Sequence, residues 1–173
     1  PGTPRGGYRG GGRGAGRAGS RTSAGGYRYE GEPPDMAFVR ALRGHTRQVT
    51  AAVLDPGSGK LYTGSQDGSV RQWDVESGVP GPTVEVGGEV DSLLLEGGWL
   101  FVGLHAPPPH PGGPPGPGTI AAYNLASGAT ARLTGHTGAV LCLAAAAGAL
   151  FSGGQDATIR AWRWDEATAT FAP

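Results

Sequence analysis

The 173-residue sequence contains a single cysteine, Cys142, and a single methionine. One cysteine excludes a disulfide framework and any cysteine-based zinc site formed by this chain alone. Long apolar runs are also missing, because the longest, from Ala139 to Leu150, is interrupted by Gly148 and is shorter than the ~20 residues of a membrane-spanning helix. We therefore expect no membrane partner, no metal site and no cofactor in this chain.

The residue patterns of common catalytic sites are absent as well. The sequence shows no Ser-His-Asp spacing, no Gly-rich phosphate-binding loop and no paired-carboxylate motif. Cys142 lies in an apolar stretch from Val140 to Ala147, where we expect a small buried side chain rather than a reactive thiol. We do not expect an enzyme.

Glycine and proline are abundant, with 34 and 15 residues, which is typical of disordered or turn-rich sequence. The net charge is zero, but the charges are unevenly distributed. Residues 1–29 contain six arginines and no acid, whereas residues 30–173 contain eight basic and fourteen acidic residues. A basic arm precedes an acidic body, which suggests that the arm binds an anion while the body has another task.

The arm, residues 1–36, has almost no aliphatic side chains, so we expect it to be disordered. Arginine pairs with phosphate and stacks on bases, and tyrosine rings stack on bases too. RNA is therefore a possible partner of the arm. The candidate RNA contacts are Arg5, Tyr8, Arg9, Arg13, Arg17, Arg21 and Arg28. The alternative is a solvated tail without a partner, since GC-rich coding sequence also produces Gly and Arg.

The sequence changes from about residue 37, where short apolar runs are separated by Gly, Asp and Ser. The first four runs predict strands at Val49–Leu54, Lys60–Thr63, Ser69–Asp74 and Thr83–Val86. Turn residues at Asp55–Gly57 and Gln66–Gly68 fit tight hairpins, because glycine supplies a positive φ. This spacing predicts an all-β fold.

One pattern recurs in this region. Gly-His at His45 is followed by Trp73, and Gly-His at His136 is followed by Trp162. The two histidines are two periods of about 45 residues apart, so a third, degenerate copy lies between them. We divide residues 37–173 into copies at about 41–86, 87–133 and 134–173, with a Pro-rich loop insertion at 106–118.

Gly-His followed by Trp-Asp at this period resembles the WD-repeat signature. The resemblance implies a β-propeller of four-stranded blades, here a partial one of about three blades. It also implies a hydrogen-bonded structural network in each complete copy. The members are His45, Thr63, Asp67 and Trp73 in copy one, and His136, Ser152, Asp156 and Trp162 in copy three. Copy two should lack the network, because Gly88, Val102 and Tyr123 stand where His, Ser/Thr and Trp would be.

The stretches Gly87–Gly103 and Ile159–Pro173 are similar to plant and algal proteins that join a CCCH zinc finger to a WD-repeat propeller. No cysteine precedes Cys142, so neither zinc nor finger-borne RNA binding carries over to any residue here. A closed propeller usually needs at least about four blades. We therefore expect either that the chain continues beyond Pro173, which we favour, or that the blades are completed by assembly.

These features favour a non-catalytic protein-interaction scaffold whose arm contacts RNA, inside the cell and with the nucleus slightly favoured over the cytoplasm. The alternative is an RNA-binding protein in which the arm and a missing zinc finger carry the function and the blades only position them. We expect His105 and His110, beside the prolines at 107–109, to be exposed loop residues. Trp99 and Trp164 are either anchors for a partner or core residues.

Overall fold

The computed structural model describes residues 38–172 except 108–109, 111–112, 114–115 and 166–169. The Arg/Gly arm, its predicted disorder and its seven candidate RNA contacts lie outside the described residues. All the strands belong to one unit, Arg40–Pro173. The description below concerns this unit.

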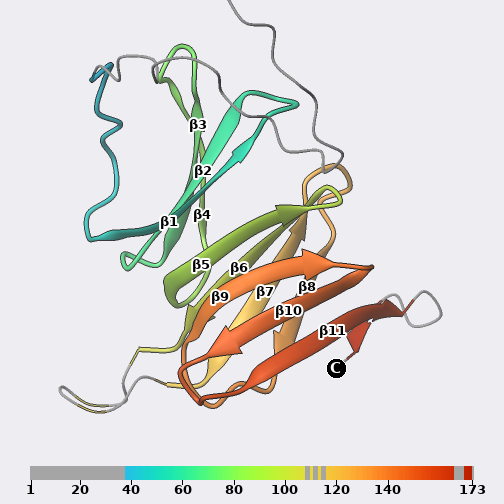
Figure 1. Cartoon of the computed structure of the whole chain (residues 1–173). Coiled ribbons are helices and arrows are strands. Elements are labelled where there is room, and N and C mark those ends of the chain that lie inside the picture. The colour runs from blue at the N-terminus through green and yellow to red at the C-terminus, as the bar shows by residue number, and fades with distance from the viewer. Residues whose placement is uncertain (1–37, 108–109, 111–112, 114–115, 166–169, 173) are drawn as a thin grey trace, which may run out of the picture. The chain divides into compact units, whose positions relative to one another are not determined.

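Three four-stranded antiparallel sheets make up the fold, and the described residues contain no helix (Figure 1). The first blade consists of β1 (Val49–Asp55), β2 (Lys60–Ser65), β3 (Ser69–Asp74) and β4 (Pro80–Glu85). The second consists of β5 (Glu89–Glu96), β6 (Trp99–His105), β7 (Gly118–Asn124) and β8 (Thr130–Thr134). The third consists of β9 (Val140–Ala146), β10 (Ala149–Gly154), β11 (Ile159–Asp165) and β12 (Thr170–Ala172). The predicted class, all-β with about three four-stranded blades, is confirmed.

Within the first blade, β4 differs most from the sequence-based expectation. It begins at Pro80 rather than at Thr83, and it ends at Glu85, so that Val86 lies beyond the strand. The strand is at the outer edge of its sheet, where the missing N–H of a proline costs no ladder hydrogen bond. The prolines at 80 and 82 are therefore compatible with an edge strand.

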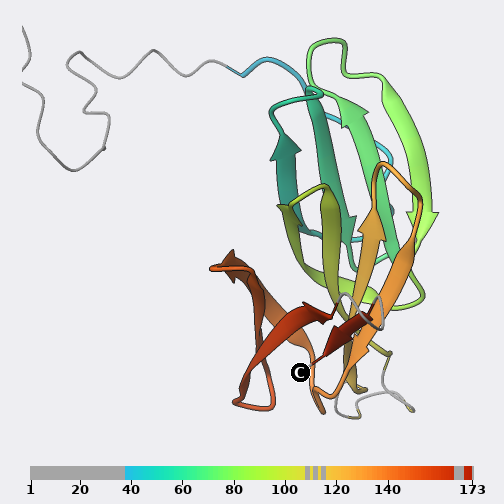
Figure 2. The same cartoon turned by 90° about the vertical axis from the view of Figure 1, so that its right-hand side faces the viewer.

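The first strands of the three blades lie next to one another, with β5 against β1 on one side and β9 on the other (Figures 1 and 2). Hydrogen bonds cross both junctions. The Thr50 hydroxyl donates to the carbonyl of Val90 at 2.6 Å, and the Ser92 hydroxyl donates to the carbonyl of Val140 at 2.9 Å. The hydrophobic core consists accordingly of two clusters, one at each junction between blades.

A glycine on the second strand of a blade lets the next blade approach. A Cβ on Gly64 would collide with the side chain of Val90, and a Cβ on Gly103 would lie 2.8 Å from the carbonyl oxygen of Val140. Val90 and Val140 are themselves fully buried. Each junction therefore packs a valine of one blade onto a side-chain-free position of the preceding blade.

Candidate functional site

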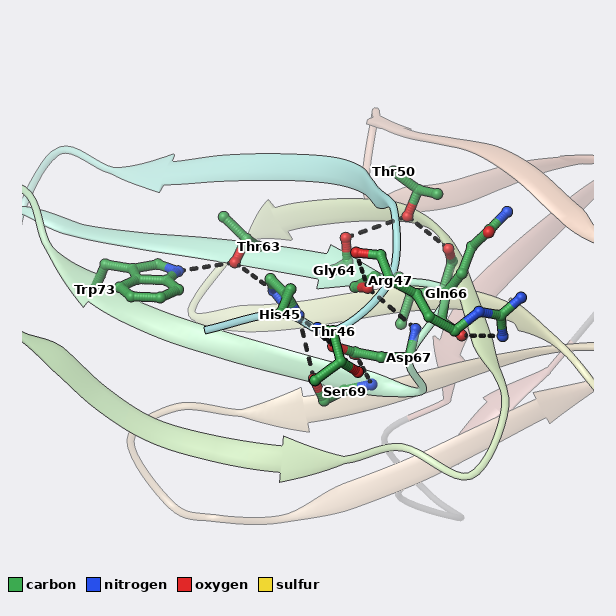
Figure 3. Close-up of polar contacts among 12 residues, drawn as sticks. His45, Thr46, Arg47, Thr50, Thr63, Gly64, Gln66, Asp67, Ser69 and Trp73 are labelled. Atoms are coloured by element: carbon green, nitrogen blue, oxygen red, sulfur yellow. Dashed lines mark hydrogen bonds and ion pairs between the residues drawn. The ribbon is translucent and has the colours of Figure 1, made fainter. Parts of the chain in front are cut away.

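The four network residues of copy one come together in the first blade (Figure 3). Thr63 on β2 accepts a hydrogen bond from Trp73 Nε1 on β3 at 2.8 Å, and its Oγ1 lies 2.9 Å from Nε2 of His45, which precedes β1. The other ring nitrogen of His45 lies 2.9 Å from Oδ2 of Asp67, in the turn between β2 and β3. One consistent set of donors satisfies all three contacts: indole N–H to hydroxyl, hydroxyl to imidazole, imidazole N–H to carboxylate.

The network residues of copy three come together in the same way in the third blade. Trp162 Nε1 donates to Ser152 Oγ at 2.9 Å, and Ser152 Oγ lies 2.9 Å from His136 Nε2. His136 Nδ1 lies 2.8 Å from Asp156 Oδ2. The eight residues named from the sequence therefore form two separate groups of four, one in each outer blade, and the hydrogen bonds seen in the described part of the chain stay within each group.

Each aspartate has a further partner that the sequence analysis did not name. Ser69 donates its hydroxyl to Asp67 Oδ1 at 2.6 Å, and Thr158 does the same to Asp156 at 2.7 Å. The backbone N–H after each histidine also donates to the aspartate, at 2.9 Å in both blades. The signal was present in the sequence, because a Ser or Thr follows the aspartate by two residues in both copies.

These contacts determine the charge state of the two aspartates. Burial raises the pKa of Asp67, but hydrogen bonds from Ser69, from the Thr46 N–H and from His45 outweigh it, and the pKa lies well below its ordinary value. The Thr158 hydroxyl outweighs burial at Asp156, and with His136 it holds the pKa of Asp156 well below the ordinary range. Both carboxylates are therefore ionised acceptors at neutral pH and are poorly suited to act as general acids.

The glycine before each histidine allows an arginine to approach. A Cβ on Gly44 would lie 2.9 Å from Arg71 Nη1, and a Cβ on Gly135 would lie 2.6 Å from Arg160 Nη1. Gly135 also has φ 147°, a conformation that side chains with a Cβ rarely adopt. In each Gly-His pair, the glycine leaves space for an arginine side chain and the histidine belongs to the network. The sequence alone did not single out these arginines.

In the second blade, buried apolar side chains take the place of the hydrogen-bonded network. The strand register also corrects the predicted alignment at the position of the network histidine. Val90 pairs with Leu104 as Val49 pairs with Ser65, so the residue four positions earlier, which is His45 in the first blade, is Val86 rather than Gly88. Val86 is 1% exposed and Val102 is 0% exposed, and both belong to one core cluster. The repeat spacing alone does not reveal the strand register, which is why it points to Gly88.

His105 is not the exposed loop residue that the sequence suggested. It is the last residue of β6, it is partly buried, and its Nδ1 lies 2.6 Å from Oδ2 of Asp91 on β5. Burial raises the pKa of Asp91, and the contact with His105 opposes this rise. The ladder between β6 and β7 extends to the Pro-rich insertion, which is why His105 lies in a strand. His110, inside the insertion, is exposed.

Cys142 is exposed, whereas its apolar neighbours in the sequence predict a buried side chain. It lies on β9 opposite Gly153, at the place that Ser92 has in the second blade. Ser92 is covered by the third blade, whereas none of the residues that the structure describes covers Cys142. The strand is apolar, as the sequence indicates, but Cys142 lies on the exposed side of the sheet.

The two additional tryptophans line a groove of about 260 Å³ between the second and third blades. Trp99 and Trp164 have ring centroids 5.6 Å apart, and Phe171 contacts Trp164 edge-on at 4.9 Å. Trp164 is 37% exposed. The hairpin between β9 and β10 forms another wall, so the groove lies at the end of β9 that is remote from His136.

Among the described residues, no group of three His, Cys, Asp or Glu side chains could hold a metal ion. Nor does that part of the chain contain a helix long and apolar enough to cross a membrane.

Comparison with known proteins identifies the repeats. The family model described as WD domain, G-beta repeat matches residues 36–74 and 127–163, the stretches that contain the two four-residue networks. This chain carries WD40 repeats. Solved structures show the same fold: the WD40 repeats of RRP9 superpose with a TM-score of 0.62 at 23% identity, over 78% of this chain and 40% of that chain.

Curated relatives are similar over more of the chain than the family model is. Zinc finger CCCH domain-containing protein 17 of Oryza sativa subsp. japonica is 38% identical over 138 residues, which is 80% of this chain and 29% of that protein. Zinc finger CCCH domain-containing protein 63 of Arabidopsis thaliana is also 38% identical over 80% of this chain and 28% of its own length. The chain thus spans less than a third of the relatives that it resembles.

The hydroxyl of Thr63 should contribute more to the stability of its blade than the corresponding methyl group of Val102 contributes in the second blade. Thr63→Val leaves the Trp73 indole N–H and Nε2 of His45 without a partner, and we expect it to lower the free energy of unfolding by about 1–3 kcal/mol. The reciprocal change Val102→Thr buries a hydroxyl without the imidazole and indole partners, so it should destabilise too. Urea denaturation of both variants measures this, and a stabilising Val102→Thr would contradict the proposed difference between the blades.

The lowered pKa values of Asp67 and Asp156 predict a loss of stability in acid. Near pH 4 the unfolded chain binds more protons than the folded one, so the free energy of unfolding should fall as pH decreases from about 5 to about 3. The double variant Asp67→Asn, Asp156→Asn should be less stable at pH 6 and show a shallower slope. Urea midpoints at several pH values test this, and parallel slopes for the two proteins would refute it.

Proposed function

We propose that this chain is a non-catalytic scaffold for protein interactions and that its Arg/Gly arm adds a contact to RNA. WD40-repeat proteins are generally non-catalytic scaffolds. The supporting observation is that the His–Asp pairs of the two outer blades, His45 with Asp67 and His136 with Asp156, are committed to internal hydrogen bonds. These bonds stabilise the loops and turns at one end of each outer blade, which suits a surface that must keep its shape when it binds.

The aromatic groove is the surface that we assign to a protein partner. Exposed tryptophans at the centre of an apolar groove commonly carry much of the binding free energy of an interface. Trp164 is held in place by Trp99 and Phe171 and is still 37% exposed, so it offers a rigid contact at little entropic cost. Glu96 is the only charged residue that lines the groove in the described part of the chain. We therefore expect a partner segment with apolar side chains.

Trp164→Ala should remove the partner without unfolding the chain, because the side chain is partly exposed. Quantitative proximity labelling in cells, compared with the unchanged chain, should show the loss of specific neighbours. Val79→Ala is the matched control, since Val79 is 58% exposed and does not line the groove. Thermal melting of both variants verifies folding. An identical set of neighbours for Trp164→Ala and the unchanged chain would exclude the groove.

The arm is proposed to contact RNA through its six arginines, because the body carries excess negative charge and would itself repel a phosphate backbone. Binding of a single-stranded oligouridine, followed by fluorescence anisotropy, should weaken with salt with a log–log slope of up to about −4 if all six arginines contact phosphates. Replacing the six arginines by glutamine should abolish binding. Replacement by lysine should keep the slope and lower the affinity, because lysine stacks less well on bases.

The second candidate function is RNA binding in which the arm acts together with a zinc finger and the blades only position them. The names of the plant relatives favour it, since they are called CCCH zinc finger proteins. The titration tests the arm, which both candidates share, and the groove variant separates them. Loss of protein neighbours with Trp164→Ala supports the scaffold, whereas arm-dependent RNA binding with an unchanged set of neighbours supports the second candidate. In either case we propose a nuclear rather than a cytoplasmic location.

A further inference from the structure

A pocket of about 260 Å³ lies between the first and second blades, apart from the aromatic groove. Tyr62 and Gln72 of the first blade and Tyr123 of the second lie in its walls. Val84 and Leu125 also line it and are 43% and 42% exposed. We call this site the tyrosine pocket and define it by these five residues. All of its walls come from the stretch 62–125.

Tyr62 and Gln72 supply hydrogen-bonding groups that the next junction lacks. They pair across β2 and β3, and their counterparts across β6 and β7 are Phe101 and Ala122. Gln72 Nε2 donates to the Tyr62 hydroxyl oxygen in a long contact of 3.4 Å, and no residue of the described chain accepts the tyrosine O–H. Burial raises the pKa of Tyr62, so the hydroxyl is protonated at neutral pH. It is therefore free to donate a hydrogen bond to a ligand.

Tyr123 brings a second unused hydroxyl to the pocket. It has the strand position that Trp162 has in the third blade. Trp162 donates its N–H to Ser152, whereas the residue in the place of Ser152 in the second blade is Val102, which accepts no hydrogen bond. Within the described part of the chain, Tyr123 makes no hydrogen bond. The absence of the network in the second blade thus leaves a tyrosine hydroxyl available in a pocket wall.

The walls indicate the kind of ligand. None of the lining residues is charged, so the pocket does not suit an ion. Its volume is below the roughly 300–1,000 Å³ of pockets that enclose whole small molecules, so it suits side chains of a longer segment. Aromatic grooves bind proline-rich segments in the polyproline II conformation. That conformation has no internal hydrogen bonds, so its carbonyl groups can accept from Tyr62, Tyr123 and Gln72.

The insertion of this chain contains such a segment. Residues 107–111 read Pro-Pro-Pro-His-Pro, and residues 106–118 contain no Asp, Glu, Lys or Arg. The Gly113 N–H donates to the His110 carbonyl at 3.0 Å, so a turn follows the proline run. Proline has no backbone N–H, and the run therefore offers carbonyl acceptors and few donors. This matches a neutral pocket whose unused groups are donors.

The proline run cannot fill the pocket of its own chain. Leu100 lines the pocket near the start of β6, whereas the insertion leaves the sheet after His105, at the end of that strand. Five residues of a strand span about 17 Å. The run starts from Ala106, whose N–H donates to the Pro117 carbonyl, and five residues of polyproline II span about 16 Å. No residue of the run is left to lie inside the pocket.

We propose that the tyrosine pocket binds the proline run 107–111 of a second copy of this chain. The occupant follows from three matches: a neutral segment with a neutral pocket, acceptors with donors, and proline rings with tyrosine rings. Each copy carries both the pocket and the run, so two copies exchange their runs in a symmetric dimer. The exchange involves neither the aromatic groove nor the arm and is independent of the function proposed above.

A fluorescently labelled peptide of residues 106–118 tests the pocket by anisotropy with the full chain. It should bind, and a peptide with alanine at the four prolines of the run should not. Tyr62→Phe should weaken binding about three- to tenfold, because it removes one donor and Phe101 shows that the ring fits. Leu125→Asp places a charge at the pocket and should abolish binding. Val79→Asp is the matched control, since Val79 is 58% exposed and does not line the pocket.

Complementation tests the second copy as the occupant. In light scattering, the full chain should approach twice the 17.4 kDa mass of one chain as its concentration rises. A chain with alanine at the four prolines of the run should be monomeric, and so should the Leu125→Asp chain. An equimolar mixture of the two should form dimers at concentrations above the Kd of the peptide, because one intact run then meets one intact pocket. Thermal melting verifies that each variant is folded.

The outcomes that contradict the proposal are distinct. A peptide that does not bind, or that binds equally to the Leu125→Asp and Val79→Asp chains, would overturn the pocket as its site. A full chain that stays monomeric at every concentration would overturn the second copy as the occupant even if the peptide binds. So would a mixture of the two variants that stays monomeric above the Kd of the peptide.

Discussion

One hydroxyl on the second strand organises each complete blade. Thr63 and Ser152 receive the indole N–H of the third strand and contact the histidine that precedes the first strand, so a single oxygen connects three segments. The aspartate in the adjacent turn completes the chain of hydrogen bonds. Because these groups lie in or near the core, each would be costly if it lost its partner. The network therefore fixes the strand register and the loop conformation together.

The second blade shows that the network is one of two solutions to the same packing problem. Val86 and Val102 replace the histidine and the hydroxyl with buried methyl groups, and the blade still has four paired strands. Apolar contact is non-directional, so it supports the sheet without fixing the neighbouring loop. This freedom is consistent with the Pro-rich insertion, which connects β6 and β7 in the blade that lacks the network aspartate.

The sequence was sufficient for the class of fold, the three copies and the network residues, because repeated spacing brings out positions that recur. It was insufficient for the position or exposure of a residue wherever these depend on the pairing between strands. His105 was assigned to a loop because prolines follow it, but β6 extends to it and Asp91 lies opposite. The repeat spacing matches Gly88 to the histidine position, whereas the register assigns Val86. The apolar neighbours of Cys142 predict a core position, yet both faces of a blade are apolar and, among the described residues, the third blade packs against another blade on one side only.

That two-sided apolar character links the fold to its behaviour as a binding protein. An isolated sheet that buries one face can present polar residues on the other, but a blade between two neighbours cannot. Ile159 and Val49 retain the identities of buried residues although they are exposed, so the surfaces that carry them are shaped for another blade rather than for water. The aromatic groove is different, because Trp164 stays partly exposed although the second and third blades already pack against each other there. The junction faces therefore suit other blades, and the groove at the edge of a completed junction is the surface that we propose for a protein partner.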